Sequence, residues 1–515
     1  MNLRDRLLAA LSVLPGKRTF HVHVLTTAPY KHPSIFPYAL PRPRVVAHDI
    51  LVLVSEQPNN DPDAPRVLVA AIEAALYLFP ATDTALLYIS KVDSTGQGAN
   101  PSPTAPLVRA FVAWHANPAT RPVHARYLWV HLFARAQAQY LFPNSAEHPG
   151  KRPLSDVRLC AWWRRILGDA TADAAGDGLA ARLFYVLPGY CALEAAQALG
   201  GADDRWTYGH PYTQTEITLP CPPPPGGVHN LGHVVPSFED DPKNRFMDEL
   251  AFTDNVVASP ARKRPRLERL ADRDREKEKD SEETGGERER EEDRRRGRDE
   301  PARPRGELGR ITADEFWERM SFRQECVTGA VTGFFVVGFA SPAPAAPDDP
   351  PPLQPQPGQV PRAMNKRVLK TLSTGVEFST PERARCATEI VENAVRGLCD
   401  GLPSAPPSSA ASSAPRPRVD ASGSLLPAEL VQGGTDAPRT PPRRAQALPS
   451  VDDVSPNPFD EPEATRETYD AFIYGSVEVR NDSPPPPLLL REAAAGHAPK
   501  KVNVLAVRKK KKATA

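Results

Sequence analysis

The sequence lacks the cysteine spacing of a disulfide-built or zinc-binding protein. Its six cysteines form no Cys-x-x-Cys pair, which predicts reduced intracellular thiols rather than a disulfide framework or a metal site. Long apolar runs are also missing, since none reaches the roughly 18 residues that a membrane span needs. We therefore expect neither a metal nor a membrane-spanning helix.

The sequence also lacks an excess of either positive or negative charge. The 64 Lys and Arg residues nearly balance the 63 Asp and Glu residues. Without a basic domain-wide charge or a zinc-finger pattern, sequence-specific nucleic-acid binding is not expected. The basic residues are clustered instead, at Arg262–Arg266 and Arg508–Lys512. Such runs are typical of nuclear localisation signals or nucleic-acid patches, and the alternative is a solvated run of charges.

Proline is what the sequence has in excess, with 59 residues among 515, roughly twice the usual share. Because apolar content is only 40%, we expect one domain of enzyme size that carries long disordered insertions. The expected segments are a core at 1–255, a charged insertion at 256–310, core again at 311–340, a proline-rich linker at 341–360, core helices at 361–400, a mostly disordered part at 401–498, and a C-terminal strand with a basic tail at 499–515.

Hydrophobic patterns predict a mixture of strands and helices, which is an α/β or mixed α+β fold. The N-terminal stretch reads as an amphipathic helix ended by Pro15-Gly16, with a signal peptide as the alternative. The expected strands are 18–26, 48–54, 85–90 and 331–339, and 66–79 is either a helix or a buried strand. The expected helices are 107–116, 125–142, 155–168 with Gly168 as the stop, and one capped by Thr312.

Two motifs follow predicted core elements. In Tyr88–Gly96 a buried strand ends in Asp-Ser-Thr-Gly, where Asp93 can bond its own backbone and Gly96 can supply positive φ. The second motif runs from Leu132 to Ser145 and continues to the pair Trp162-Trp163. Its cationic residues, Arg135, Lys151 and Arg152, could contact a pyrophosphate, while Phe133, Tyr140 and the tryptophans could line a groove. The alternative is a helix–loop–helix with aromatic core residues.

The third motif is Phe238–Phe246, in which Asp240 and Asp241 precede Pro242 and Lys243. Asp241 is placed to cap a helix that begins at Pro242. Lys243 then falls in the first turn, where the helix dipole disfavours its charge. The alternative is a capped helix with incidental charges.

The three motifs in this order resemble the fungal histone H3 lysine acetyltransferase family. The most specific blocks are Tyr-Leu-Phe-Pro at 140–143 and Asp-Asp-Pro-Lys at 240–243. The resemblance implies a central mixed sheet surrounded by helices, with acetyl-coenzyme A bound in a cleft. This fold is similar to that of a metazoan coactivator lysine acetyltransferase. It also implies a nuclear enzyme that acts on histone H3 (with H4) beside histone chaperones of the nucleosome-assembly and anti-silencing classes.

Site residues follow from the resemblance and from the residue types. The catalytic candidates are Asp241, Asp93, Trp163 and Asp240, and Lys243 matches a lysine that becomes acetylated in the enzyme itself. The candidates for binding acetyl-coenzyme A are Val92, Asp93, Ser94, Phe133, Arg135, Gln137, Tyr140, Arg152, Pro153, Leu154 and Trp162. The sequence departs from the family pattern at Gln137, which replaces a smaller residue, and in the shorter link between Asp93 and Phe133.

The chemistry requires a proton acceptor, because a lysine ammonium must lose a proton before its nitrogen attacks a thioester. Asp241 is the best candidate, with Asp93 and Asp240 contributing electrostatics and Trp163 shaping an apolar lysine channel. A water-mediated base, or no dedicated base, is the alternative. A non-catalytic chromatin scaffold that binds histone chaperones is the alternative function.

Overall fold

A computed structural model describes residues 2–58, 64–175, 178–252, 306–323, 331–341, 355–400, 459 and 461–481. The strands are β1 (Gly16–Thr27), β2 (Tyr30–His32), β3 (Val45–Pro58), β4 (Val67–Phe79), β5 (Thr84–Ser94), β6 (Tyr127–Ala134), β7 (Ala180–Val186), β8 (Trp206–Tyr208), β9 (Gly333–Ala340), β10 (Gln359–Val360) and β11 (Tyr474–Asn481). The α-helices are α1 (Leu3–Ser12), α2 (Thr104–Ala116), α3 (Asp156–Ala175), α4 (Ala192–Ala198), α5 (Pro242–Phe252), α7 (Ala313–Met320), α9 (Arg362–Thr374), α10 (Pro381–Cys399) and α11 (Arg466–Thr468). Short 3₁₀ turns lie at η1 (Pro80–Thr82), η2 (Ser145–Glu147), η3 (Leu231–His233) and η5 (Gly306–Gly309), and a π-helical turn at η6 (Tyr469–Ile473).

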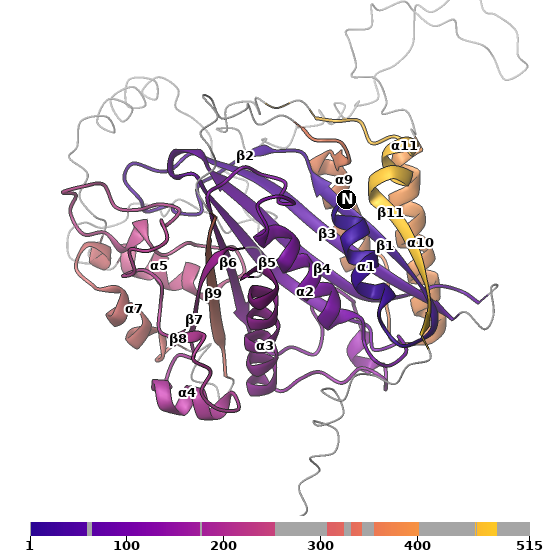
Figure 1. Cartoon of the computed structure of the whole chain (residues 1–515), viewed down its shortest axis with the longest axis horizontal. Helices are drawn as coiled ribbons and strands as arrows, with labels where there is room; N and C mark the ends of the chain where they lie inside the picture. The colour runs from indigo at the N-terminus through magenta and orange to yellow at the C-terminus, as the bar shows by residue number, and fades with distance from the viewer. Residues whose placement is uncertain are drawn as a thin grey trace, which may run out of the picture.

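One mixed sheet organises the molecule, as the sequence predicts (Figure 1). Its strand order is β10-β1-β3-β4-β5-β6-β9-β7-β8, with β11 also paired to β1 and β2 to β3. The pairs β1–β10, β5–β6 and β7–β8 are parallel, and the others are antiparallel. The parallel β5–β6 pair brings the carboxyl ends of two central strands to the same edge of the sheet.

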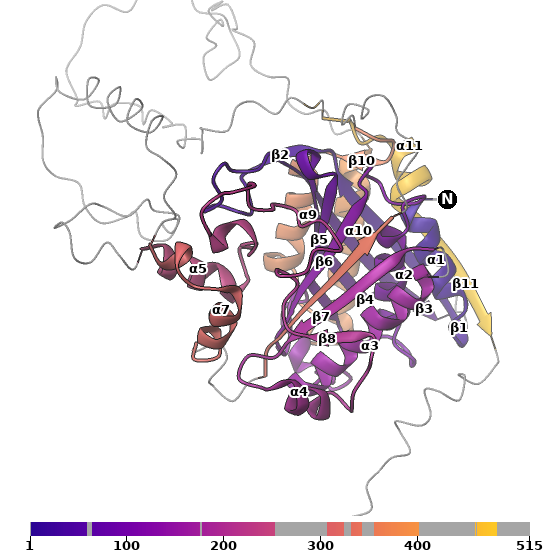
Figure 2. The same cartoon turned by 60° about the vertical axis from the view of Figure 1, so that its left-hand side comes forward.

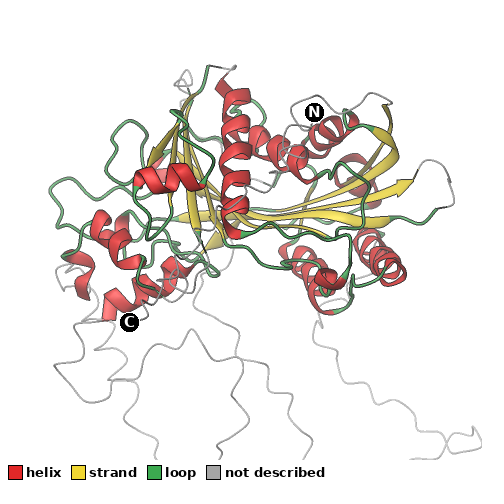
Figure 3. Cartoon of the chain, turned by 90° about the horizontal axis from the view of Figure 1, so that it is seen from below, coloured by secondary structure: helices red, strands yellow, loops and turns green. Residues whose placement is uncertain are grey.

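Helices cover both faces of this sheet (Figure 3). Alternate strand residues such as Val52 and Leu87 form a core with α1, α2 and α3. On the other face, Leu51 and Leu53 pack against α9 and α10. Figure 2 shows α5 and α7 together at the far end of that second face, where Phe246 and Phe316 pack into one cluster. The second face therefore carries two separate groups of helices.

Most expected elements are confirmed, including the capped N-terminal helix α1, the strands β1, β3, β5 and β9, and the helices α2, α7, α9 and α10. The ambiguous run 66–79 is strand β4. The predicted helix at 125–142 is wrong, because β6 occupies Tyr127–Ala134 and a loop follows it. Both faces of β6 are buried, and the resulting continuous apolar run hides the alternation that identifies a strand. Helix α3 also continues past Gly168 to Ala175.

The predicted insertion at 256–310 ends earlier than expected. Gly306 begins the turn η5 with φ of +56°, and a side chain there would overlap the backbone of Leu250 and Ala251 in α5. Leu308 is fully buried in the same cluster as Leu250. Residues 306–310 thus belong to the core, while 253–305 lie outside the described residues.

The predicted disordered part at 401–498 contains a structured return to the core. Strand β11 pairs antiparallel with β1 from Gly16↔Asn481 to His23↔Tyr474, and Tyr469 and Ile473 of η6 are buried against α10. The prediction of disorder is wrong for β11, because the alternation of its apolar and polar residues is short and follows a long Pro/Ser-rich stretch. The strand expected at 499–515 lies outside the described residues.

Disulfides and membrane-spanning helices, neither of which the sequence predicts, can be assessed within the described ranges only. The five cysteines in them are free thiols. None of the helices described there has the length and apolar character needed to cross a membrane.

Because α5 and η5 touch, the chain leaves and re-enters the core at neighbouring points. We predict that deleting residues 265–301 leaves the domain folded, since the remaining link still spans a short gap and shortening a loop lowers its closure entropy cost. The urea midpoint of the deleted protein should equal or slightly exceed that of the full chain. Insoluble protein, or a lower midpoint, would contradict this domain map.

Candidate active site

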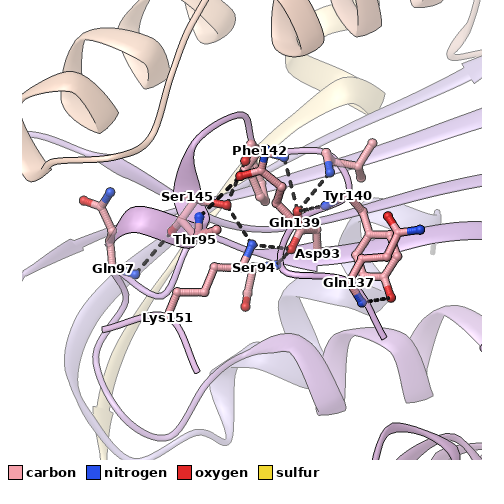
Figure 4. A network of polar contacts seen from close by, with 12 residues as sticks. Asp93, Ser94, Thr95, Gln97, Gln137, Gln139, Tyr140, Phe142, Ser145 and Lys151 are labelled. Atoms are coloured by element: carbon pink, nitrogen blue, oxygen red, sulfur yellow. Dashed lines mark hydrogen bonds and ion pairs between the residues drawn. The ribbon is translucent and has the colours of Figure 1, made fainter. Parts of the chain in front are cut away.

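The turn after β5 holds Asp93 at the centre of a polar network (Figure 4). Its Oδ2 accepts hydrogen bonds from the backbone N–H groups of Tyr140 (2.8 Å), Leu141 (2.9 Å) and Phe142 (3.2 Å). Its Oδ1 accepts the N–H of Ser94 at 2.8 Å, as the turn chemistry predicts. Asp93 therefore joins the end of β5 to the loop that follows β6.

Lys151 is the cation of this network. Its Nζ donates to Asp93 Oδ1 at 2.8 Å and to Ser145 Oγ at 2.7 Å, and both charged side chains are almost fully buried. Gly96, with φ of +75°, allows the backbone at Lys151 to approach closely. The sequence expectation that Lys151 contacts a pyrophosphate is therefore wrong, because its ammonium is enclosed beside Asp93.

The loop between β6 and α3 presents the other cofactor candidates. Tyr140 donates its hydroxyl hydrogen to Arg135 O and accepts the N–H of Gln137 at 3.1 Å, which fixes the loop locally. The side chain of Gln137 is exposed and that of Arg135 is half-buried. Neither Arg135 nor Arg152 has an ion-pair partner within the described ranges. Guanidinium groups can bind phosphate oxygens through paired donors, and contact of Arg135 and Arg152 with a pyrophosphate stays a prediction.

The segment before α3 adds apolar surface to this edge. Arg152, Pro153 and Leu154 are all exposed, and Leu154 keeps 40% of its surface accessible. Val92 and Ser94, the remaining candidates from the turn, are half-buried. Their contact with acetyl-coenzyme A stays a prediction.

The third motif forms a buried ion pair. Asp241 caps α5 as predicted, since its Oδ1 accepts the N–H of Lys243 at 2.9 Å. Lys243 folds back so that its ammonium also donates to Asp241 Oδ2. Both residues are buried, at 2% and 4% exposure. The unfavourable dipole interaction expected for Lys243 in the first turn is thus offset, because its ammonium pairs with the carboxylate of Asp241.

Aromatic rings surround this pair. The Lys243 ammonium lies 4.6 Å from the ring centroid of Phe334 and 5.9 Å from that of Phe238, which stabilises its charge. Phe238 stacks on Tyr88 at 3.8 Å. Phe133 lies 5.0 Å from Phe334, so a predicted cofactor residue joins the same cluster.

Asp240 lies at the rim of the cluster. Its carboxylate accepts the Tyr88 hydroxyl at 2.9 Å, and its residue is exposed. Asp240 is therefore placed to act on the site electrostatically, as the sequence suggests, rather than to hold a proton inside it.

Burial sets the protonation of the inner groups. Desolvation raises the pKa of Asp241, although the Lys243 ammonium opposes the shift. Desolvation, together with the Lys243 charge, lowers the pKa of His131 to about 3, so His131 is neutral at ordinary pH. Burial and the nearby charges of Asp241 and Asp240 raise the pKa of Tyr88 far above its usual value. Among the inner carboxylates, Asp241 therefore has an increased affinity for a proton.

The structure contradicts the lysine-channel role predicted for Trp163, the second residue of the tryptophan pair. Trp163 is 6% exposed and packs in the core between α3 and the sheet. Asp241 and Lys243 lie on the opposite face, with Phe238 and Phe334. Trp163 therefore cannot shape a lysine channel beside Asp241, and core packing explains it. Trp162 packs edge-on against Trp163 at 4.8 Å and is half-buried.

Sequence reasoning missed Tyr88, His131, Phe238 and Phe334 as site residues. Tyr88 belongs to a quoted motif, and the alternation of β5 and β6 places Tyr88, His131 and Phe133 on one face. Phe334 comes from β9, and only the tertiary fold brings it there. No group of three or more residues of the kinds that bind metals gathers anywhere in the described ranges.

Comparison with known proteins gives consistent results. Residues 113–394 match the family model of the histone acetyltransferase KAT11-type domain. The chain is 29% identical over 309 residues to the histone acetyltransferase rtt109 of Aspergillus flavus, which covers 53% of this chain and 45% of that relative. It is 22% identical over 334 residues to the protein of the same name from Schizosaccharomyces pombe, covering 63% and 69%. The alignment thus spans about half the length of the Aspergillus flavus relative.

A solved structure shares the fold. The crystal structure of Rtt109 from Aspergillus fumigatus superposes with a TM-score of 0.54 and 22% sequence identity, over 77% of this chain and 96% of that one. At this identity the likeness concerns the fold alone.

The buried ion pair makes a prediction about stability. Replacing Asp241 by Asn keeps a capping oxygen but leaves the Lys243 ammonium buried without a counter-charge, which should cost about 3 kcal/mol or more in the free energy of unfolding. The double variant Asp241→Asn/Lys243→Gln removes both charges and should recover most of that loss. Urea unfolding of wild type, Asp241→Asn, Lys243→Gln and the double variant measures the coupling. Additive losses would show that the two side chains are not paired.

Proposed function

The chain belongs to the histone acetyltransferase family of the KAT11 type, and on that premise we propose that it transfers the acetyl group of acetyl-coenzyme A to lysine side chains of histone H3. The observation that carries the proposal is the contact between Asp241 and Lys243. A lysine ε-amine lies hydrogen-bonded to a buried carboxylate, among aromatic rings. The surroundings of Asp241 thus already suit a lysine side chain.

Asp241 is the proposed proton acceptor. Burial raises its pKa, which strengthens it as a base toward an incoming ammonium. Asp241 takes one proton from the substrate lysine ammonium, and the neutral nitrogen then forms the new N–C bond with the thioester carbonyl. As the C–S bond breaks, the nitrogen loses its second proton to the leaving thiolate, so that coenzyme A departs as the thiol. Asp240 adds negative charge at the rim.

Acetyl-coenzyme A supplies the thioester carbonyl when it is bound. Arg135 and Arg152 are proposed to hold its pyrophosphate, since guanidinium groups bind phosphate oxygens through paired donors. The exposed surface of Leu154 and the ring of Phe133 are proposed to contact its pantetheine arm. Gln137 and Tyr140 order the loop between these contacts.

Lys243 is proposed to become acetylated in the enzyme itself. Acetylation removes the ammonium that occupies Asp241, so the carboxylate becomes free for a substrate lysine. The buried amine must first move, because both partners are nearly inaccessible. The modification would thus exchange an internal lysine for a substrate lysine at the same carboxylate.

The biological setting follows the family resemblance. We propose nuclear action on histone H3 with H4, in chromatin assembly, genome stability after DNA damage and transcription regulation. The partners would be histone chaperones of the nucleosome-assembly and anti-silencing classes. The basic runs that favour nuclear import, Arg262–Arg266 and Arg508–Lys512, lie outside the described residues. The rival function is a non-catalytic scaffold that binds the same chaperones and needs no carboxylate at position 241.

The decisive experiment compares two variants that both lack the Lys243 charge. Wild type, incubated with histone H3–H4, acetyl-coenzyme A and each class of chaperone, should acetylate H3 lysines as read by mass spectrometry. The Lys243→Gln protein should be active, and Lys243→Gln/Asp241→Asn should be slower by about a hundred-fold or more, because an amide cannot accept the proton. Equal rates would exclude Asp241 as the base, and an inactive wild type would favour the scaffold.

The same pair of variants gives a pH test of the base. Activity of the Lys243→Gln protein should rise with pH as Asp241 loses its proton. The midpoint should lie above the ordinary aspartate range, since burial raises the pKa of Asp241. The double variant should show no such transition.

A third prediction concerns Lys243 itself. Intact peptide mass analysis of residues 239–248 should find Lys243 acetylated in wild type purified from its own host. Protein carrying Asp241→Asn should remain unmodified there, because it lacks the proposed acceptor. An unmodified Lys243 in active wild type would show that self-acetylation plays no part.

A further inference from the structure

Asp93 uses all of its acceptor capacity on the protein. Its two oxygens receive five donors, namely four backbone N–H groups and the ammonium of Lys151. A carboxylate offers about four lone-pair sites. No site remains for a proton from a substrate, so Asp93 acts on the loop after β6 rather than on the reaction.

Lys151 neutralises the buried charge of Asp93. A carboxylate buried at 6% exposure would otherwise be costly, and three N–H groups of one loop converge on it. The ammonium neutralises the charge and also bonds Ser145 Oγ, whose hydroxyl donates to Phe142 O at 2.7 Å. One cation thus fixes both the carboxylate and the far end of the loop.

The turn between α9 and α10 holds the same loop from its other side. Phe378 donates its N–H to Pro143 O at 2.8 Å and packs its ring 4.9 Å from that of Phe142. Glu377 accepts from Asn144 Nδ2 at 3.0 Å. The loop is therefore fixed between Asp93 with Lys151 on one side and a helical hairpin on the other.

We propose that Lys151 is a positioning residue for acetyl-coenzyme A, and that Asp93 is its partner in that task. The proposal rests on the proposed function. The Asp93–Lys151 pair holds the loop 135–145, which presents Arg135 and Gln137, in a fixed shape before the ligand binds. A loop ordered before the ligand arrives loses less conformational entropy on binding, so affinity depends on the pair. Acetyl transfer at saturation depends on it much less.

The test replaces Lys151 by Met, which keeps the apolar stem and removes the ammonium. Hydrogen exchange of the amides of residues 140–142, measured without ligand, should lose protection. The dissociation constant for coenzyme A, measured by calorimetry, should rise about ten-fold or more, as expected when a charge-assisted contact that orders the site is lost. The KM for acetyl-coenzyme A should rise in step, with kcat far less affected.

Lys91→Met is the matched control. Lys91 lies on the same strand as Asp93, but its ammonium pairs with Glu73 on the neighbouring strand β4, at 2.8 Å, rather than with Asp93. Its removal should leave exchange at 140–142 and coenzyme A affinity unchanged. Asp93→Asn should behave like Lys151→Met, whereas a proton acceptor at position 93 would lower kcat and leave coenzyme A affinity intact.

If Lys151→Met fails to fold, Ser145→Ala gives the same measurement in milder form, since it removes one Lys151 contact and keeps the ion pair. Normal exchange and normal coenzyme A affinity in the folded variant would overturn the inference. A wild type that binds no coenzyme A would contradict the proposed function instead, and the exchange data would still report on the loop alone.

Discussion

The parallel pairing of β5 with β6 is the constraint on which the site depends. From Thr84↔Tyr127 to Ile89↔Leu132 the two strands run in register, so both end at one edge of the sheet. β5 therefore delivers Asp93 to the place where the loop after β6 begins. The same register puts Tyr88 and His131 on one face, under Phe238. A shift of one residue would turn these side chains into the opposite core.

Two buried lysine–carboxylate pairs differ in how firmly they are held. Asp93 has four backbone donors besides Lys151, so its charge is satisfied by the chain on all sides. Asp241 has one backbone donor and otherwise depends on the Lys243 ammonium. A buried pair whose partner can be exchanged or neutralised is a weak source of stability, but it leaves a strong base when the cation departs. The Asp93–Lys151 pair is therefore suited to holding a loop in place, and the Asp241–Lys243 pair to accepting a proton.

The sequence predicted what local chemistry determines. The cap at Asp241, the turn at Asp93, the positive φ of Gly96 and the mixed α+β architecture all follow from residue types and short spacings. The failures have a tertiary cause. The sequence predicts a helix at β6 because both faces of that strand are buried. The channel role of Trp163 comes from the family resemblance, and the helix pattern does not tell which face of the sheet α3 covers. Lys151 was read as a phosphate ligand because its partner, Asp93, is 58 residues away.

The return of β11 and η5 to the core shows how the long proline-rich and charged stretches are accommodated. The described residues on either side of two of these stretches lie close together. Gly306 lies against Leu250 and Ala251 near the end of α5, and Asp400 at the end of α10 pairs with Arg466 of α11. Since closing a loop costs little more as its length grows, such stretches can vary in length and composition without moving the strands. The residues that hold Asp93 and Asp241 all lie in the described strands, helices and loops, so the site does not depend on where the long stretches between them begin and end.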